Sequence, residues 1–146
     1  AVGGVVLVPT LLASAGMVED ADDDARPAAE SLARAHRAVV TRALELGVEV
    51  ALGTDCPMRP HGRNAEELGL LVEAGMAPVD AFRAATSVAA RLLGLESEVG
   101  TIRPGRAADF VVLEGDGLTT EGLAERIVAV YRSGRHAGPA ARPRSA

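Results

Sequence analysis

The stretch from Val48 to Asp55 places the strongest constraint on the fold. It alternates apolar and polar residues, then runs through Ala51 and Leu52 into a glycine, a threonine and an aspartate. This pattern predicts a strand that delivers Asp55 to its C-terminal end. Because open α/β sheets and barrels place their chemistry at that edge, Asp55 is the first candidate functional residue.

A strand and a helix precede this stretch. Val5 to Leu12 is a nearly continuous apolar run, which favours a strand buried on both faces of a parallel sheet. From Pro27 to Leu46, apolar residues recur three or four positions apart and Gly47 then gives a stop signal, which predicts an amphipathic helix. Its apolar positions are Leu32, Ala35, Val39, Ala43 and Leu46. Strand, helix and strand in this order predict a βαβ unit with parallel strands and a right-handed crossover.

The link between the first strand and the helix is acidic. Residues Ser14 to Asp24 include five carboxylates and a glycine, but they lack the spacing and turn glycine of a calcium loop. We therefore expect a solvated loop whose last aspartates favour the N-terminus of the following helix.

Three short helices are predicted after Asp55. The loop from Cys56 to Arg63 is rich in proline and glycine, and Asn64 then opens a helix with Glu67 in the capping-box position. A second helix begins at Pro78, and a third is expected from a Thr86 cap to Gly94. Their alanine-rich faces indicate packing elements.

A short antiparallel β module follows these helices. Strands are predicted near Thr101, over 109–113 and over 127–131, with a Pro-Gly turn after the first of them. The Pro-, Arg- and Ala-rich residues from His136 onward are typical of a frayed tail. The chain is thus an α/β protein with an α/β portion over 1–98, a β portion over 99–135 and a disordered tail over 136–146.

Composition excludes several classes of protein. The net charge of −5 and the lack of a basic face argue against a nucleic-acid binder, and no apolar run is long enough to span a membrane. The one cysteine, Cys56, excludes an internal disulfide and is compatible with the cytoplasm, where we expect the chain. The sequence has no initiator methionine and enters a strand almost at once, so we expect it to be cut from something longer.

An ordered series of motifs resembles the C-terminal part of the metal-dependent amidohydrolases. It is most similar to the imidazolonepropionase-like and Xaa-Pro dipeptidase-like branch, and the likeness extends from Val5 to about Arg135. The motifs are the run 51–55, His-Gly-Arg-Asn at 61–64, Glu67-Leu68, Leu-Val-Glu-Ala-Gly-Met at 71–76, Ala-Ala-Thr at 84–86, Leu93-Gly94 and the run 100–113.

The resemblance implies a fold and a chemistry. The fold would be a distorted (β/α)8 barrel, with its last two strands here, and part of a small β-sandwich. Asp55 would fall on the family's metal ligand or catalytic base, beside a divalent metal, most simply zinc. The substrates would be small molecules with an amide, cyclic amide or dipeptide bond.

A metal and a carboxylate suit this hydrolysis. A divalent metal lowers the pKa of its bound water to about 7, and a neighbouring carboxylate can receive the water's proton and pass it to the leaving nitrogen. The resemblance implies that the other ligands lie upstream, whereas a catalytic zinc needs about three protein ligands. We therefore expect a C-terminal fragment that is inactive alone and whose partner is an upstream barrel portion.

Two other functions remain open. A noncatalytic binding or assembly module, or a pseudoenzyme remnant, would use exposed strand edges for self-association or partner capture. An unrelated metal- or phosphate-binding α/β domain is the weaker alternative, because no glycine-rich phosphate loop follows either strand.

The three histidines and the cysteine can each be explained without a catalytic role. His61 is either a substrate-pocket residue or a plain loop histidine, and Cys56 is favoured as a small filler over a soft metal ligand, since it has no partner at short spacing. His36 is expected on the surface, and His136 is expected to be a bystander in the tail.

Overall fold

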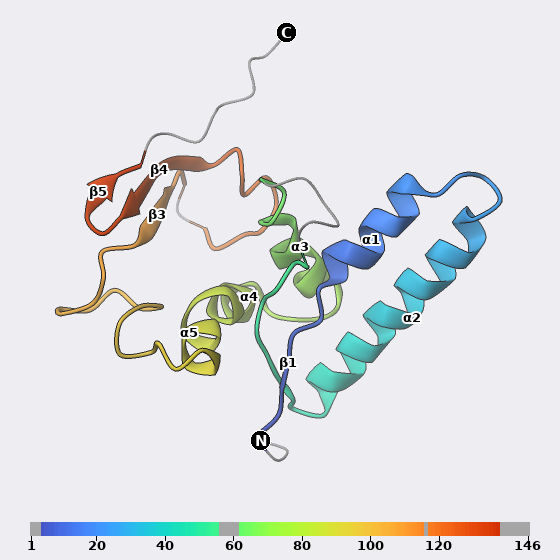
Figure 1. Cartoon of the computed structure of the whole chain (residues 1–146), viewed down its shortest axis with the longest axis horizontal. Helices are drawn as coiled ribbons and strands as arrows, with labels where there is room; N and C mark the ends of the chain where they lie inside the picture. The colour runs from blue at the N-terminus through green and yellow to red at the C-terminus, as the bar shows by residue number, and fades with distance from the viewer. Residues whose placement is uncertain (1–3, 56–61, 116, 138–146) are drawn as a thin grey trace, which may run out of the picture.

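The structure is a computed structural model that describes residues 4–55, 62–115 and 117–137 (Figure 1). An α/β part comes first and a small antiparallel sheet follows it. The elements of the first part are β1 (Val6–Leu7), α1 (Leu11–Asp20), α2 (Arg26–Glu45), β2 (Glu49–Val50), α3 (Glu66–Glu73), α4 (Pro78–Arg83), a π-helical turn η1 (Ala84–Val88) and α5 (Ala89–Leu92). The sheet consists of β3 (Phe110–Leu113), β4 (Ile127–Arg132) and β5 (Arg135–His136).

The predicted parallel pairing of the two strands is confirmed, but two helices, α1 and α2, lie between them instead of one. Strands β1 and β2 pair in parallel with Val6 opposite Glu49 and Leu7 opposite Val50, and the amide of Ala51 donates to the carbonyl of Leu7 at 2.9 Å. Helix α2 leads into β2 and has a proline in its first turn, where no intrahelical amide donor is needed. Both strands are short, so the parallel sheet of the described residues has two strands of two residues each.

The first strand is shorter than the sequence predicts, and the acidic loop is mostly a helix. Thr10 turns the backbone into the left-handed region, with φ of 54°, and α1 starts at Leu11. The end of the apolar run therefore supplies the buried first turn of α1. Glu19 and Asp20 close this helix, which leaves only residues 21–25 as a connection to α2.

The capping box predicted at Asn64 and Glu67 is wrong. Helix α3 begins at Glu66, Ala65 stands at its N-cap, and no side chain caps it. Asn64 instead contacts the end of the β2 segment, and Glu67 points into the protein, where its side chain is fully buried. Tertiary contacts have replaced the local hydrogen bonds that the spacing suggested.

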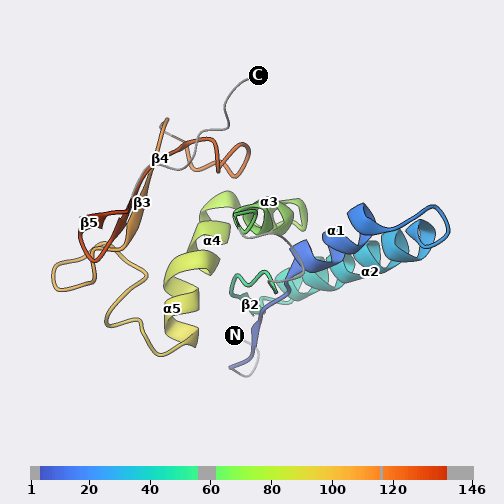
Figure 2. The same cartoon turned by 45° about the horizontal axis from the view of Figure 1, so that its top comes forward.

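The second and third predicted helices form one continuous run from Pro78 to Leu92 (Figure 2). Thr86 lies inside this run, so its predicted role as a cap is wrong. Its hydroxyl donates to the carbonyl of Phe82 at 2.7 Å, a bond to the preceding turn that a helix interior allows. The π-helical turn at 84–88 accommodates the extra residue within the run.

The C-terminal sheet has the order β3-β4-β5, and both pairs are antiparallel. Phe110 and Tyr131 stack with ring centroids 4.6 Å apart, and the ring of His136 meets Tyr131 edge-on at 5.4 Å. His136 therefore belongs to a strand and not to a tail, while residues 138–146 lie outside the described part. The segment near Thr101 is not a strand.

The core lies where the helices meet β2. It is built from Leu11, Val40, Val50, Leu68, Leu71, Ala74, Met76, Ala81, Ala84 and Leu123. In both views α1 and α2 lie side by side as a helical pair, and the small sheet stands on the far side of α3 and α4 (Figures 1 and 2). None of the described helices is long and apolar enough to cross a bilayer.

Candidate active-site edge

The two parallel strands are each followed by a residue in a left-handed conformation. Thr10 has φ of 54° after β1, and Asp55 has φ of 50° after β2. Because the strands are parallel, both residues come from the carboxyl-end side of the sheet. Left-handed backbone is unusual for a β-branched residue such as threonine, and such conformations cluster at functional sites. The left-handed conformations of Thr10 and Asp55 therefore support the same sheet edge that the sequence predicts as the candidate site.

Gly53 allows the two chain segments to approach each other closely. A Cβ atom at this position would lie 2.5 Å from Cγ1 of Val8 and 3.6 Å from Cγ2 of Thr10. The first distance is shorter than real Cβ contacts, so the side chain of Val8 occupies the space that a Cβ on residue 53 would need. The segment between β2 and Asp55 therefore passes close to the segment that follows β1.

Asn64 connects the end of the β2 segment to the start of α3. Its side-chain amide donates to the hydroxyl of Thr54 at 3.2 Å, and its side-chain oxygen accepts from the backbone amide of Gly62 at 3.2 Å. Asn64 thus links Thr54, the residue before Asp55, to Gly62, which precedes α3.

Glu67 anchors the start of α1 from helix α3. Its two carboxylate oxygens accept hydrogen bonds from the backbone amides of Leu11 at 2.8 Å and Leu12 at 2.6 Å. These amides belong to the first turn of α1, whose donors have no partner within the helix. Burial raises the pKa of Glu67 above its usual value, while the two backbone hydrogen bonds oppose that rise. One buried side chain therefore fixes the turn between β1 and α1.

Arg63 holds the same region together on the surface. Its guanidinium group contacts both carboxylate oxygens of Glu66 at 2.6 Å, and it contacts Glu19 at 3.0 and 3.2 Å. The hydrogen bond to Glu66 raises the pKa of Arg63, so its charge is secure. The C-terminal end of α1 and the start of α3 thus share one cation.

The described residues offer one candidate catalytic carboxylate and an incomplete set of metal ligands. Asp55 is exposed at the edge. Within residues 4–55, 62–115 and 117–137, no three His, Cys, Asp or Glu side chains gather in a way that could hold a metal ion. A catalytic zinc takes about three protein ligands, so this part of the chain does not fit a complete zinc site. His61 and Cys56 lie outside the described residues.

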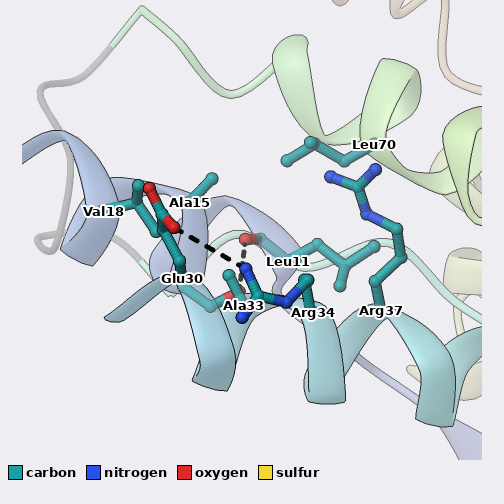
Figure 3. Close-up of a pocket in the computed structure, with 9 residues that line it drawn as sticks. Leu11, Ala15, Val18, Glu30, Ala33, Arg34, Arg37 and Leu70 are labelled. Carbon is teal, nitrogen blue, oxygen red and sulfur yellow. Dashed lines mark hydrogen bonds and ion pairs between the residues drawn. The ribbon is translucent and has the colours of Figure 1, made fainter. Parts of the chain in front are cut away.

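An open hollow of about 350 Å³ lies away from this edge, between α1, α2 and α3 (Figure 3). Two arginines line it, and each already has a carboxylate partner: Arg37 lies 3.0 Å from Glu73, and Arg34 lies 3.6 Å from Glu30. The charges of the hollow are therefore balanced within the protein. We assign it no ligand, and we base the candidate site on Asp55.

A polar contact beside the hollow corrects the prediction for His36. The Nδ1 atom of His36 lies 3.0 Å from the hydroxyl oxygen of Ser14, and this hydroxyl donates to the carbonyl of Leu11 at 2.9 Å. His36 is therefore half-buried and joins α2 to α1.

The sequence analysis missed the roles of Glu67 and Thr10. The local spacing from Asn64 to Glu67 matched a capping box, and nothing local indicates an acceptor for amides more than fifty positions earlier. A weak signal was present for Thr10, because a threonine directly before apolar residues can mark the start of a helix. The apolar run through Leu12 masked that signal.

Comparison with known proteins identifies the chain. Residues 2–136 match the amidohydrolase family. The chain belongs to this family. The resemblance found in the sequence motifs is thereby confirmed.

Two curated proteins match part of the chain. Ochratoxinase from Aspergillus niger is 39% identical over 87 residues, which are 58% of this chain and 18% of that protein. Imidazolonepropionase from Geobacillus kaustophilus is 38% identical over 76 residues, which are 49% of this chain and 18% of that protein.

The crystal structure of a Xaa-Pro dipeptidase, described with methionine bound in its active site, matches with a TM-score of 0.80 and 30% identity. The match covers 91% of this chain and 34% of the dipeptidase. This amidohydrolase chain therefore spans about a third of the length of that structure, and it contains a mixed α/β part and a small antiparallel sheet of the family fold.

Proposed function

We propose that the chain contributes the Asp55 carboxylate to the active site of a metal-dependent amidohydrolase that cleaves carbon–nitrogen bonds. One observation carries the proposal: Asp55, five residues beyond the carboxyl end of β2, has a left-handed conformation, and it follows closely on the tight approach of Gly53 to Val8, the residue after β1. Catalytic groups of α/β proteins lie at this edge. The contacts of Glu67 and Asn64 support the segments on both sides of it.

We also propose a place in a larger fold. Strands β1 and β2 would be adjacent strands of a (β/α)8 barrel, and β3 to β5 would be part of a β-sandwich. Because such barrels hold their catalytic groups on the loops after several strands, residues beyond this chain would complete the site.

Asp55 would act as a proton carrier. Its carboxylate would accept a proton from the water that attacks the carbonyl carbon, and it would return this proton to the leaving nitrogen. A divalent metal, most simply zinc, would make that water acidic, and ligands outside the described residues would be needed to hold it. The substrates would be small amides, cyclic amides or dipeptides, and the Xaa-Pro dipeptidase is the guide to the first ones to assay.

Reconstitution tests this proposal. The chain is co-expressed with the part of the Xaa-Pro dipeptidase that it does not cover, and hydrolysis of Xaa-Pro dipeptides is measured. We expect metal-dependent hydrolysis, a loss of about 100-fold or more for Asp55→Asn, and no loss for Asp24→Asn, a matched change in the exposed connection before α2. Full activity of the Asp55→Asn variant would overturn the assignment.

A noncatalytic assembly module is the second candidate. It is favoured by apolar side chains that the described residues leave exposed on α2, such as Leu32 and Val39. A stable complex without hydrolysis of any Xaa-Pro dipeptide would favour this role over catalysis.

A further inference from the structure

Hydrogen bonds hold the segment between β2 and Asp55 from two sides. The amide of Ala51 donates to the carbonyl of Leu7 at 2.9 Å, which continues the pairing of β1 with β2. The next amide, that of Leu52, donates to the carbonyl of Ala84 at 3.0 Å. Because successive residues of an extended chain alternate in direction, these two bonds leave the segment on opposite sides.

The acceptor for Leu52 belongs to a helix and not to a strand. Ala84 is the first residue of the π-helical turn η1, and it is only 1% exposed. The run from Pro78 to Leu92 that contains this turn passes beside the β2 segment (Figure 2). A π-helical turn inside an α-helix is rare, and such turns are frequent at functional sites. This irregular turn therefore contacts the segment that carries the candidate catalytic residue.

The π-helical turn is itself held in place. A Cβ atom at Gly100 would lie 2.9 Å from the carbonyl oxygen of Thr86 and 3.2 Å from Cα of Ser87, so the chain passes tightly over the turn. The hydroxyl of Thr86 donates to the carbonyl of Phe82 at 2.7 Å. Ala84 is also part of the buried core. Its carbonyl is therefore a fixed point for the β2 segment.

The path from Leu52 to Asp55 is short and closely packed. Leu52 packs against the core, and Gly53 approaches Val8 closely. The hydroxyl of Thr54 accepts from Asn64 at 3.2 Å. Only Gly53 and Thr54 lie between Leu52 and Asp55, so a shift of Leu52 changes the position of Asp55.

We propose that Ala84 is a positioning residue for the reaction, because its backbone carbonyl holds Leu52 and thereby places the Asp55 carboxylate. Ala84 touches no reacting atom and acts through the segment 52–55. This inference rests on the proposed function, in which Asp55 carries a proton. Proton transfer needs hydrogen-bond distance to the reacting group, and a displacement of about 1 Å can cost about 100-fold in rate.

An amide-to-ester replacement at Leu52 tests the proposal, because it removes the N–H donor and keeps every side chain. The matched control is the same replacement at Met76, whose amide donates to the buried Leu71 carbonyl at 3.1 Å, beyond the C-terminal end of α3. Circular dichroism shows that both variants are folded. The control separates the loss of this particular bond from the loss of any buried backbone bond.

The first readout is the backbone mobility of the full chain, measured by nitrogen-15 NMR relaxation. We expect the order parameter of the Asp55 amide to fall from about 0.85 to below about 0.6 in the Leu52 ester and to stay unchanged in the Met76 ester. An unchanged value in the Leu52 ester, or an equal fall in both esters, would overturn the proposal.

Hydrogen exchange of the wild-type chain gives a test that needs no variant. The Leu52 amide is expected to exchange at least about 100-fold more slowly than an unprotected amide, because it is bonded to a buried carbonyl. Exchange at the unprotected rate would show that the bond to Ala84 does not form, and would overturn the proposal.

The second readout is hydrolysis of Xaa-Pro dipeptides by the chain combined with the part of the dipeptidase that it does not cover. We expect the Leu52 ester to lower kcat about tenfold and to leave KM within about twofold, with no loss of kcat for the Met76 ester. An unchanged kcat in the Leu52 ester would overturn the proposal. If the wild-type combination hydrolysed nothing while Asp55 became mobile in the Leu52 ester alone, the proposed function would fail and the positioning contact would stand.

Discussion

Among the residues that the structure describes, Glu67 is the one carboxylate whose side chain is fully buried. Its partners are two backbone amides and not a cation. Removing the carboxylate would leave two buried donors unpaired, and each such donor costs about 1–3 kcal/mol.

Replacement of Glu67 by alanine is therefore expected to lower the free energy of unfolding by about 2–5 kcal/mol. The matched control is Glu66→Ala, because Glu66 is the preceding residue but makes an exposed ion pair with Arg63. Exposed pairs contribute about 0–1 kcal/mol. Urea unfolding measures both variants, and equal losses would contradict the anchoring role.

The pH dependence of stability gives a second test at Glu67. Its pKa is raised in the folded chain, so the folded state binds this proton more tightly than the unfolded state. The contribution to stability is fully present below the unfolded pKa, and it is lost as the pH rises through the folded pKa. We expect Glu67→Gln to remove this decline when unfolding is measured from pH 4 upward. If the stability of Glu67→Gln depended on pH in the same way as that of the wild-type chain, the raised pKa of Glu67 would be contradicted.

Gly100 illustrates a close approach of the backbone to a helix. A Cβ atom there would lie 2.7 Å from the Cβ of Ala90 and 2.9 Å from the carbonyl oxygen of Thr86, and φ is +85°. Gly105 has nearly the same φ, +84°, but nothing lies within 4 Å of its would-be Cβ. Comparing alanine substitutions at Gly100 and Gly105 therefore distinguishes the cost of steric overlap from the cost of a left-handed backbone.

We expect Gly105→Ala to cost about 1 kcal/mol, from the left-handed conformation alone, and Gly100→Ala to cost about 2–4 kcal/mol. Thermal and urea unfolding of the two variants measure the difference. Equal destabilisation of the Gly100→Ala and Gly105→Ala variants would contradict the close packing of residue 100 against Ala90 and Thr86.

At the scale of elements, the helical run from Pro78 to Leu92 carries a testable difference between sequence pattern and structure. A hydroxyl cap at Thr86 would contribute about 1 kcal/mol, whereas a hydroxyl inside a helix contributes little. We expect Thr86→Ala to change stability by less than about 0.5 kcal/mol.

The matched control is Thr41→Ala, because Thr41 donates from α2 to the carbonyl of Ala74 at 2.8 Å. Loss of that link between α2 and the end of α3 is expected to cost about 1 kcal/mol. A larger loss for Thr86→Ala than for Thr41→Ala, measured by urea unfolding, would favour two separate helices.

Elements with strong periodic patterns were predictable from the sequence, and elements fixed by distant contacts were not. Helix α2, the parallel pairing of β1 with β2, and strands β3 and β4 follow from apolar spacing and turn residues. Helix α1 was missed because its amide donors are satisfied by Glu67, which lies more than fifty positions away. The same contact explains why the capping box failed.

The candidate site shows the same division. The position of Asp55 after β2 was predictable because strand, glycine and carboxylate occur together in the sequence. Three other features depend on how β1, α1 and α3 pack, and the sequence did not predict them. They are the close contact at Gly53, the left-handed backbone of Thr10 and the hydrogen bonds of the Glu67 carboxylate. The metal and substrate assignments for Asp55 and His61 stay predictions.

At the scale of the whole molecule, the described residues combine a candidate active-site edge with exposed apolar side chains. Aromatic residues make up 2% of the sequence, so burial depends on small side chains. Leu32, Val39 and Leu46 remain exposed in the described part. Both features are consistent with a chain that reaches its full stability and function together with more of the amidohydrolase fold.

The amount of metal bound per purified chain tests the central claim most directly. Elemental mass spectrometry after size exclusion would give it, for the wild-type chain and for Asp55→Asn. The account predicts well below one metal ion per chain for both, because one carboxylate does not make a catalytic site. About one zinc per wild-type chain that survives a mild chelator wash and is lost in Asp55→Asn would contradict the account, since the chain would then complete its own metal site.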